Sequence, residues 1–323
     1  MNTQISELEQ QLTELYTQQL KDGVILSQVY DDIHRISPIT ENDTLKFYIQ
    51  HNPHRVQRGI SYKQNPTPKH TIKYKGGIPC FLCMDNIMYQ WPNEKGHPYT
   101  IDNLPLIFLP NLFPIFPFHF TIASQDHLPQ TINVPTLLSL AKALPSHWII
   151  QNGPDAGATN PEHFHYQSFQ TTNLPTDLPI TIYPKHLIHH SDTLTINKLD
   201  HPATLYHFEF SSPEIIPSVS TVVMNFLAQN NHHRVNLLGT YDPQKKRWQL
   251  IILLRHTHQK TDFYKTGQPG YAEAAGIIST YSPEYHDHWL KNSTSLYTKL
   301  MTDIACTEES EKTFKTLLKT CYT

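Results

Sequence analysis

The sequence predicts an α+β protein built from about two structural units. Apolar residues at three- and four-residue steps indicate helices near both ends, and strand-like segments fill the region between them. The length of 323 residues fits two units at roughly 150 residues per domain. Hydrophobic residues make up 38% and aromatic residues 11% of the chain, which is enough for packed cores and argues against disorder.

The N-terminal segment has the pattern of an amphipathic helix, and we predict a helix over residues 4 to 21. Its apolar face is formed by Ile5, Leu8, Leu12, Leu15, Tyr16 and Leu20. Residues 52 to 70 are basic and contain several prolines. This segment is therefore predicted to be a loop or short strand with the potential to bind phosphate.

The middle of the chain alternates between strand and helix signals. Residues 104 to 123 are dense in Leu, Ile and Phe but interrupted by proline, which predicts successive strands with turns at the prolines. Residues 135 to 144 are predicted to form a helix opened by proline. Residues 148 to 151 are predicted as a short buried strand, after which turn formers lead to a new strand at His163.

The C-terminal part is predicted to begin with strands and to end with helices. A soft boundary lies near residues 190 to 202, where a new strand-rich section begins. Residues 235 to 241 and 248 to 254 flank a turn-forming segment and are predicted to form a hairpin. From about residue 283 onward the pattern is mostly helical.

Charge and hydropathy exclude two classes of function. Lys and Arg total 25 against 28 for Asp and Glu, so a dedicated nucleic-acid-binding protein is not expected. Four prolines interrupt the longest apolar stretch, residues 104 to 118, so no membrane-spanning helix is expected. The first twenty residues are acidic and lack an apolar core, so they do not resemble a signal peptide. We therefore expect a cytoplasmic protein.

Two of the four cysteines form a Cys-x-x-Cys motif at Cys80 and Cys83. Four cysteines in a chain of this length make a poor disulfide scaffold, and in a reducing compartment this spacing favours metal binding or redox chemistry. A pair of buried thiols is the alternative interpretation of the motif alone. Because the chain contains 21 histidines, no single histidine identifies a site.

The strand predicted at His163 would present several polar side chains on one face. Alternate side chains of a strand share a face, so His163, His165 and Gln167 point one way while Phe164 and Tyr166 point into a core. Successive polar groups are then about 6 to 7 Å apart. The alternative is an edge strand whose polar side chains face water.

This strand resembles the active-site strand of the histidine-triad superfamily. Because the third position is Gln, the sequence is more similar to the branch of galactose-1-phosphate uridylyltransferases, diadenosine tetraphosphate phosphorylases and GDP-L-galactose phosphorylases. The resemblance implies an α+β fold with two histidine-triad-like antiparallel-sheet halves and flanking helices. It covers roughly residues 52 to 170 and rests on His163-Phe-His165-Tyr-Gln167, on Asn152, Gly153, Gly157 and Thr159 before it, and on the segment Asn111 to His127.

The resemblance also implies a structural zinc site formed by Cys80, Cys83, His127 and His163. Two thiolates and two neutral imidazoles make a closed tetrahedral Zn²⁺ site in which no coordination position is left for water. Such a site is structural and would hold the start of the active-site strand.

The resemblance assigns the chemical step to His165 and Gln167. A neutral His165 imidazole would attack the phosphorus of a bound nucleotide, while its other ring N–H donates to a backbone carbonyl near His163. The product is a covalent nucleotidyl-histidine that a second acceptor discharges. Gln167 can donate an amide N–H to a phosphoryl oxygen but cannot act as a general acid. Leaving groups that are already stable anions are therefore favoured.

Further residues are candidates for phosphate binding. The glycine-bearing turn provides Asn152, Gly157 and Thr159, although a turn of this kind is often only a turn. The basic segment provides Arg55 and Arg58, whose guanidinium groups suit bidentate phosphate contacts, and a solvated charged loop is the alternative.

These features predict a nucleotidyltransferase or phosphorylase. Its substrate would be a nucleoside diphosphate sugar or a dinucleoside polyphosphate, and its acceptor phosphate or a sugar phosphate. Residues 1–195 are predicted to form the catalytic half with the zinc site, and residues 196–323 a second histidine-triad-like half with a helical tail. The alternatives are a nucleotide hydrolase of the same fold and a non-catalytic, zinc-stabilised nucleotide-binding protein.

Overall fold

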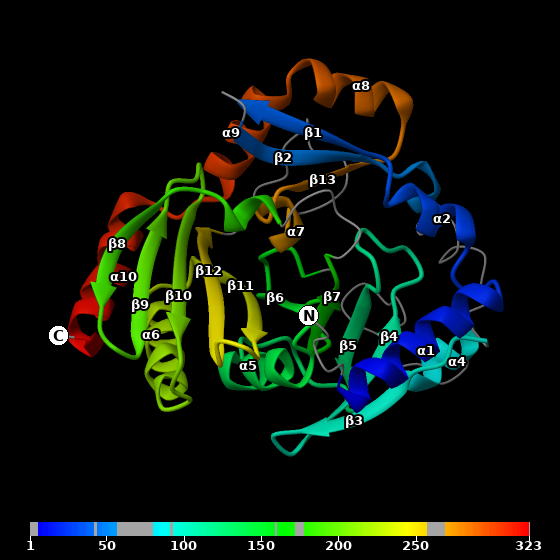
Figure 1. Ribbon diagram of the computed structural model, residues 1–323, viewed down its shortest axis with the longest axis horizontal. Coiled ribbons are helices and arrows are strands. Elements are labelled where there is room, and N and C mark those ends of the chain that lie inside the picture. The colour runs from blue at the N-terminus through cyan, green and yellow to red at the C-terminus, as the bar shows by residue number, and fades with distance from the viewer. Residues whose placement is uncertain are drawn as a thin grey trace.

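A ten-stranded sheet forms the centre of the computed structural model (Figure 1). The structure describes residues 6–41, 44–56, 80–90, 93–158, 160–171, 178–256 and 269–322. The strand order in the sheet is β3-β4-β5-β7-β6-β11-β12-β10-β9-β8, and the neighbours are antiparallel. Its strands are β3 (His97–Ile101), β4 (Leu104–Pro110), β5 (Phe120–Ser124), β6 (Trp148–Asn152), β7 (His165–Phe169), β8 (Lys185–His190), β9 (Leu194–Leu199), β10 (Thr204–Phe210), β11 (His233–Asp242) and β12 (Arg247–His256).

The sheet is an internal repeat of two five-stranded halves. The strand order is β3-β4-β5-β7-β6 in the first half and β8-β9-β10-β12-β11 in the second. In both halves the fifth strand along the chain lies between the third and the fourth. Each half carries one helix between its third and fourth strands, namely α5 (Val134–Ala143) and α6 (Ile215–Gln229). The halves join where β6 pairs with β11, from Asn152·Asn236 to Ile149·Gly239. The predicted fold class of two antiparallel-sheet halves is confirmed, whereas the division at residue 195 stays a prediction.

Helices cover one face of this sheet. Their apolar side chains and those of the sheet form one core, which includes Leu12, Leu137, Val222 and Phe314. The helices are α1 (Glu7–Lys21), α5, α6 and α10 (Glu308–Tyr322). The helix predicted over residues 4 to 21 is confirmed as α1, and its start is fixed by a capping box in which the Ser6 side chain and Glu9 satisfy each other's backbone N–H groups.

A smaller unit covers the other face of the second half. In it, β1 (Ile36–Glu41) pairs with β2 (Thr44–His51), and β2 pairs in parallel with β13 (Ile277–Thr280). Buried side chains of β2 and β13 pack against apolar side chains of β11 and β12. The remaining elements are α2 (Ser27–Asp32), η1 (Pro53–Val56), α4 (Met84–Gln90), η2 (Pro179–Thr181), α7 (Tyr271–Ala274), α8 (Pro283–Lys291) and α9 (Ser293–Ile304).

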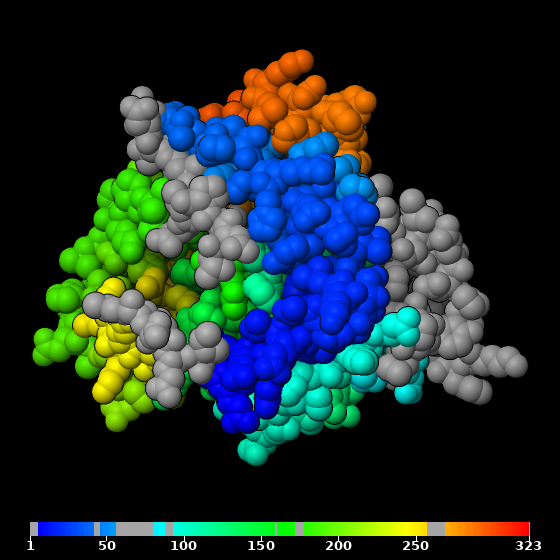
Figure 2. All heavy atoms as spheres, turned by 45° about the vertical axis from the view of Figure 1, so that its right-hand side comes forward, coloured from blue at the N-terminus to red at the C-terminus, as the bar shows by residue number. Residues whose placement is uncertain are grey.

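The molecular surface places the N-terminal segment beside the first half of the sheet. In Figure 2 the blue α1 and α2 form a continuous band between the orange α8 above and the cyan β3–β4 hairpin below. None of the helices in the described ranges is long and apolar enough to cross a lipid bilayer.

Most sequence-predicted elements are present with small shifts in their ends. The proline-interrupted segment forms β4 and β5, the helix after Asn133 is α5, and the C-terminal hairpin is β11–β12. The strand expected from His163 begins at His165 instead. The reason is a turn before it, in which the His163 N–H donates to the Asn160 carbonyl at 3.4 Å.

We expect the shared sheet to make the join between the halves a main source of stability. Leu237 on β11 is fully buried in the core beneath α5, so Leu237→Ala should lower the free energy of unfolding by about 2 to 5 kcal/mol in urea titrations. Leu187→Ala is the matched control, because Leu187 on the edge strand β8 is 64% exposed, and it should change stability by less than about 0.5 kcal/mol. Similar losses from both variants would contradict this placement of the core.

Candidate active site and metal site

Four side chains from separate parts of the first half form a compact cluster of metal ligands. One ligand atom each of Cys80, Cys83, His127 and His163 lies within 4.8 Å of all the others. The cysteines precede α4, His127 follows β5, and His163 lies directly before β7. The structure therefore brings together all four residues of the predicted metal site, and they could hold a metal ion.

The histidine ligands are oriented for this task. The His163 Nε2–H donates to the Ser124 carbonyl at 2.8 Å, which leaves Nδ1 as a lone pair 3.3 Å from the Cys80 sulfur. Nδ1 of His127 lies 3.1 Å from the Cys83 sulfur. A ring N–H held by a carbonyl is the usual way in which proteins fix the tautomer of a metal-binding histidine.

The electrostatics of the two thiols also favour a cation between their sulfur atoms. Burial raises the pKa of the Cys80 thiol, but its hydrogen bonds with His163, the Leu82 backbone and Asn160 outweigh burial and lower it to about 6. Burial and the neighbouring Cys80 sulfur raise the pKa of Cys83 to about 12. Two thiolates side by side repel each other, and a divalent cation removes that repulsion. The donor set therefore fits a metal ion.

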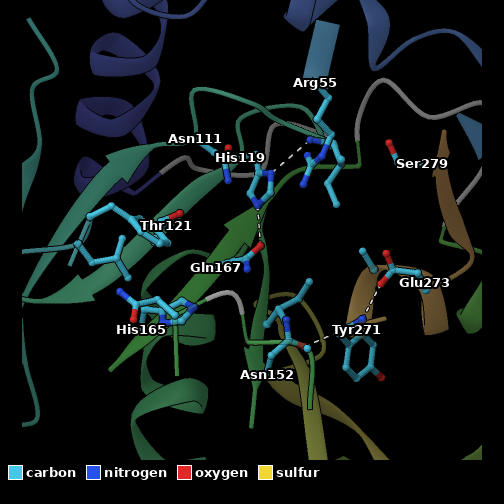
Figure 3. Close-up of a pocket in the computed structure, with 18 residues that line it drawn as sticks. Arg55, Asn111, His119, Thr121, Asn152, His165, Gln167, Tyr271, Glu273 and Ser279 are labelled. Atoms are coloured by element: carbon cyan, nitrogen blue, oxygen red, sulfur yellow. Dashed lines mark hydrogen bonds between the residues drawn. The ribbon is translucent and has the colours of Figure 1, made fainter. Parts of the chain in front are cut away.

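The His165 side chain lies on β7, two residues beyond His163, and lines the floor of a pocket (Figure 3). Its Nδ1 is 2.7 Å from the His163 carbonyl oxygen. Because a carbonyl only accepts hydrogen bonds, Nδ1 carries the proton and Nε2 carries the lone pair. This geometry is the one that a nucleophilic imidazole needs.

Gln130 fixes the backbone around His165. Its Oε1 accepts the His165 N–H at 2.8 Å, while its Nε2 donates to the carbonyls of His165 and Asn152 at 3.0 and 2.8 Å. The side chain is buried, and it ties the start of β7 to the end of β6. The sequence carries no sign of this contact, because Gln130 lies in a connecting loop far from the His-x-His-x-Gln strand.

Gln167 is held by a histidine that the motif analysis did not assign. Nε2 of His119 lies 2.8 Å from Oε1 of Gln167, and the Ile115 N–H donates to the His119 Nδ1 at 3.4 Å. His119 therefore donates from Nε2, so the Gln167 amide oxygen is occupied and its NH₂ group is the part available to a ligand. In Figure 3 His119 lies above Gln167, and a dashed line marks the hydrogen bond between them.

Two loops from opposite halves of the sheet meet at Gly157. This residue has φ +89°, and a Cβ there would lie 2.6 Å from both the Gly270 Cα and the Pro269 oxygen. Glycine is required here for both the backbone conformation and the close approach. Asn152 supports the contact, because its Oδ1 accepts the Tyr271 N–H at 2.9 Å and also a hydrogen bond from Asn236.

A buried arginine fastens the same two loops. The Arg255 Nη1 donates to the carbonyls of Pro269 and Ala156 at 2.6 and 3.2 Å. Arg255 is fully buried at the end of β12, and burial lowers its pKa to about 10. Arg255, at the end of a strand of the second half, therefore holds together the two loops that meet at Gly157.

The pocket brings most of the sequence-predicted residues together around a cavity of about 130 Å³. It is lined by His165, Gln167, Asn152, Gly157 and Arg55. Arg55 donates from Nη1 to the Phe113 carbonyl at 2.5 Å. The second half adds Glu273 and Ser279, which the sequence did not identify as site residues. Arg58 and Thr159, also predicted to bind phosphate, lie outside the described residues.

Comparison with solved structures identifies this fold. Yeast Ap4A phosphorylase in complex with Ap4A matches with a TM-score of 0.60 at 14% identity, over 93% of this chain and 97% of that chain. The same enzyme without Ap4A gives a TM-score of 0.59. The chain has the fold of an Ap4A phosphorylase. The expected resemblance to diadenosine tetraphosphate phosphorylases is thereby confirmed at the level of the fold.

Sequence comparison agrees with this assignment of the fold. Galactose-1-phosphate uridylyltransferase of Staphylococcus saprophyticus is 23% identical over 237 residues, which cover 61% of this chain and 47% of the relative. The chain therefore spans about half the length of this curated relative. A family model described as a domain of unknown function, DUF4922, matches residues 15–170, the part that contains the metal cluster and His165.

We expect the purified protein to contain about one metal ion per chain, because its four ligands converge without rearrangement. The double variant Cys80→Ser, Cys83→Ser should lose this metal in elemental analysis and should melt at lower temperature, since metal binding contributes to folding. The matched control is Cys306→Ser, Cys321→Ser, whose thiols lie at the start and the end of the C-terminal segment and outside the cluster. Metal retained in the first variant would contradict this site.

Proposed function

We propose that the protein is a nucleotidyltransferase, of phosphorylase or hexose-1-phosphate transferase type, that works through a covalent nucleotidyl-His165 intermediate. The observation that carries this proposal is the contact between Nδ1 of His165 and the His163 carbonyl beside the amide of Gln167. The substrate is a nucleoside diphosphate sugar or a dinucleoside polyphosphate. The acceptor is phosphate or a sugar phosphate.

In the first step the lone pair on Nε2 of His165 forms a bond to the substrate phosphorus as the bond to the leaving-group oxygen breaks. The ring becomes a phosphorylated imidazolium, and its Nδ1–H stays hydrogen-bonded to the His163 carbonyl. That hydrogen bond strengthens as the ring becomes positive, which stabilises the transition state. The leaving group departs as a phosphate anion and needs no proton.

Gln167 acts on the phosphoryl oxygens rather than on the leaving group. Because its oxygen is engaged by His119, its amide NH₂ is directed at the ligand. An amide donates a hydrogen bond to the developing charge but cannot protonate a poor leaving group. Attack by the acceptor's phosphate oxygen then reverses the first step and releases the new nucleotide. Transfer to phosphate is therefore favoured over hydrolysis.

The metal in this proposal is zinc, and its role is structural. Two thiolates and two imidazoles are a complete tetrahedral Zn²⁺ donor set, which leaves no position for water or substrate. Cys80, Cys83, His127 and His163 would hold the segment whose carbonyl orients His165. The ion would supply stability to this segment, while the chemistry belongs to the protein side chains.

His165→Ala should abolish turnover by several powers of ten, because the covalent route is lost. Metal content and melting temperature should stay near those of the wild type, whereas His163→Ala should lower the metal content as well as the activity. Wild-type protein mixed with nucleotide sugars or dinucleoside polyphosphates should show a nucleotide adduct on His165 in mass spectra. Orthophosphate should remove that adduct. Turnover by His165→Ala, or an adduct on another residue, would overturn the mechanism.

The same mixtures distinguish the rival functions. Product formation at equal rates with and without phosphate or a sugar phosphate would indicate a hydrolase. Tight nucleotide binding with neither turnover nor an adduct would indicate a non-catalytic binding protein.

His119→Phe should lower kcat by about 10- to 100-fold while KM changes little, because the Gln167 amide loses the contact that fixes its orientation. The metal content should not change, and the melting temperature should fall only slightly, because an aromatic ring is kept but the Ile115 N–H loses its acceptor. Gln167→Ala should lower kcat to a similar degree, and the double variant should be no worse than the single one, since both act through one amide. Additive losses would show that His119 acts by another route.

A further inference from the structure

Asn160 joins two segments of the chain that are 80 residues apart. Its side-chain Nδ2 donates to the Cys80 sulfur at 3.2 Å, and its backbone carbonyl accepts the His163 N–H at 3.4 Å. Both partners belong to the metal cluster, with Cys80 in the segment before α4 and His163 directly before β7. One residue therefore holds a sulfur ligand against the turn that leads to His165.

The amide of Asn160 suits the sulfur in one orientation only. A thiolate accepts hydrogen bonds and offers no donor, so the NH₂ group points at the sulfur and the amide oxygen points away from it. The side chain is fully buried, and its oxygen has no hydrogen-bond partner among the residues that the structure describes. A buried oxygen without a partner costs free energy, so the contact with Cys80 is what favours an amide here over an apolar side chain.

The two sulfur atoms of the cluster have different surroundings. The Cys80 sulfur is hydrogen-bonded by the Asn160 side chain and by the Leu82 backbone, neither of which is a metal ligand. In the described ranges the Cys83 sulfur contacts only other members of the cluster, namely the two imidazoles and the Cys80 sulfur. Hydrogen bonds to an anionic ligand stabilise its charge and fix its position, and such groups around a metal site strengthen metal binding.

We propose that Asn160 is a positioning residue of the metal site, whose amide N–H fixes the Cys80 thiolate and thereby strengthens metal binding. The alternative is that Asn160 only shapes the turn before β7. The two roles make different demands on the side chain, because the turn uses the backbone carbonyl, which every residue has, whereas the contact with sulfur needs the NH₂ group. This inference does not depend on the reaction proposed for His165.

The test uses the full-length protein loaded with Co²⁺ during expression, because thiolate-bound Co²⁺ absorbs light by charge transfer from sulfur. Asn160→Leu roughly keeps the volume of the side chain but removes its N–H groups. The charge-transfer band should move to longer wavelength, because a sulfur lone pair that loses a hydrogen bond lies higher in energy. In competition with EDTA the affinity for Co²⁺ should fall about 10- to 100-fold, and Asn160→Ala should behave in the same way.

The matched control is Asn86→Leu, because Asn86 is also buried and donates to the Cys80 carbonyl, at 2.8 Å, instead of to its sulfur. This variant should lower the melting temperature but leave the charge-transfer band in place. A wild-type band and affinity in Asn160→Leu, or an equal band shift in Asn86→Leu, would overturn the role of Asn160. A wild-type protein that holds no Co²⁺ would overturn the metal site together with this inference, while adduct formation on His165 is measured independently.

Discussion

The hydrogen bond between Nδ1 of His165 and the His163 carbonyl is the contact on which the site depends. It gives His165 one tautomer, with the lone pair on Nε2 of a side chain that lines the pocket. Three contacts position this carbonyl: the His163 ring lies beside the two cysteines, its Nε2–H donates to the Ser124 carbonyl, and Gln130 holds the backbone of His165. One metal ligand, His163, and the proposed nucleophile His165 thus lie on the same short backbone segment.

The two halves of the sheet have the same strand order, but the same face is polar in the first half and apolar in the second. On β7 this face carries His165 and Gln167, whereas on the corresponding strand β12 it carries Ile251 and Leu253, which are buried beneath the small sheet of β2 and β13. The second half instead contributes Arg255 and the Gly270 loop, which close the pocket from the side. The first half of the sheet therefore provides the polar side chains on the strands of the pocket, and the second half provides the loop that closes it.

The parts of the site that the sequence revealed are those contained in short motifs. Cys80 and Cys83, and the alternating His163, His165 and Gln167, are recognisable because ligand spacing and strand periodicity are local properties. His119 and Gln130 act through contacts between segments that are distant in the sequence, so residue spacing does not reveal them. The two halves were expected only from the family resemblance, because their side chains differ. The strand β7 begins later than expected because a local turn from Asn160 to His163 interrupts the strand pattern.

The close packing of Gly157 against Gly270 carries a consequence for how such a protein changes during evolution. A Cβ at Gly157 would meet backbone atoms of the opposite half, so the two halves cannot diverge independently at this point. Ile251 and Leu253 on β12 need only fill volume beneath the small sheet and can be exchanged for other apolar residues. Within one sheet, natural selection therefore acts on chemistry in one half, on packing in the other, and on backbone shape where they touch.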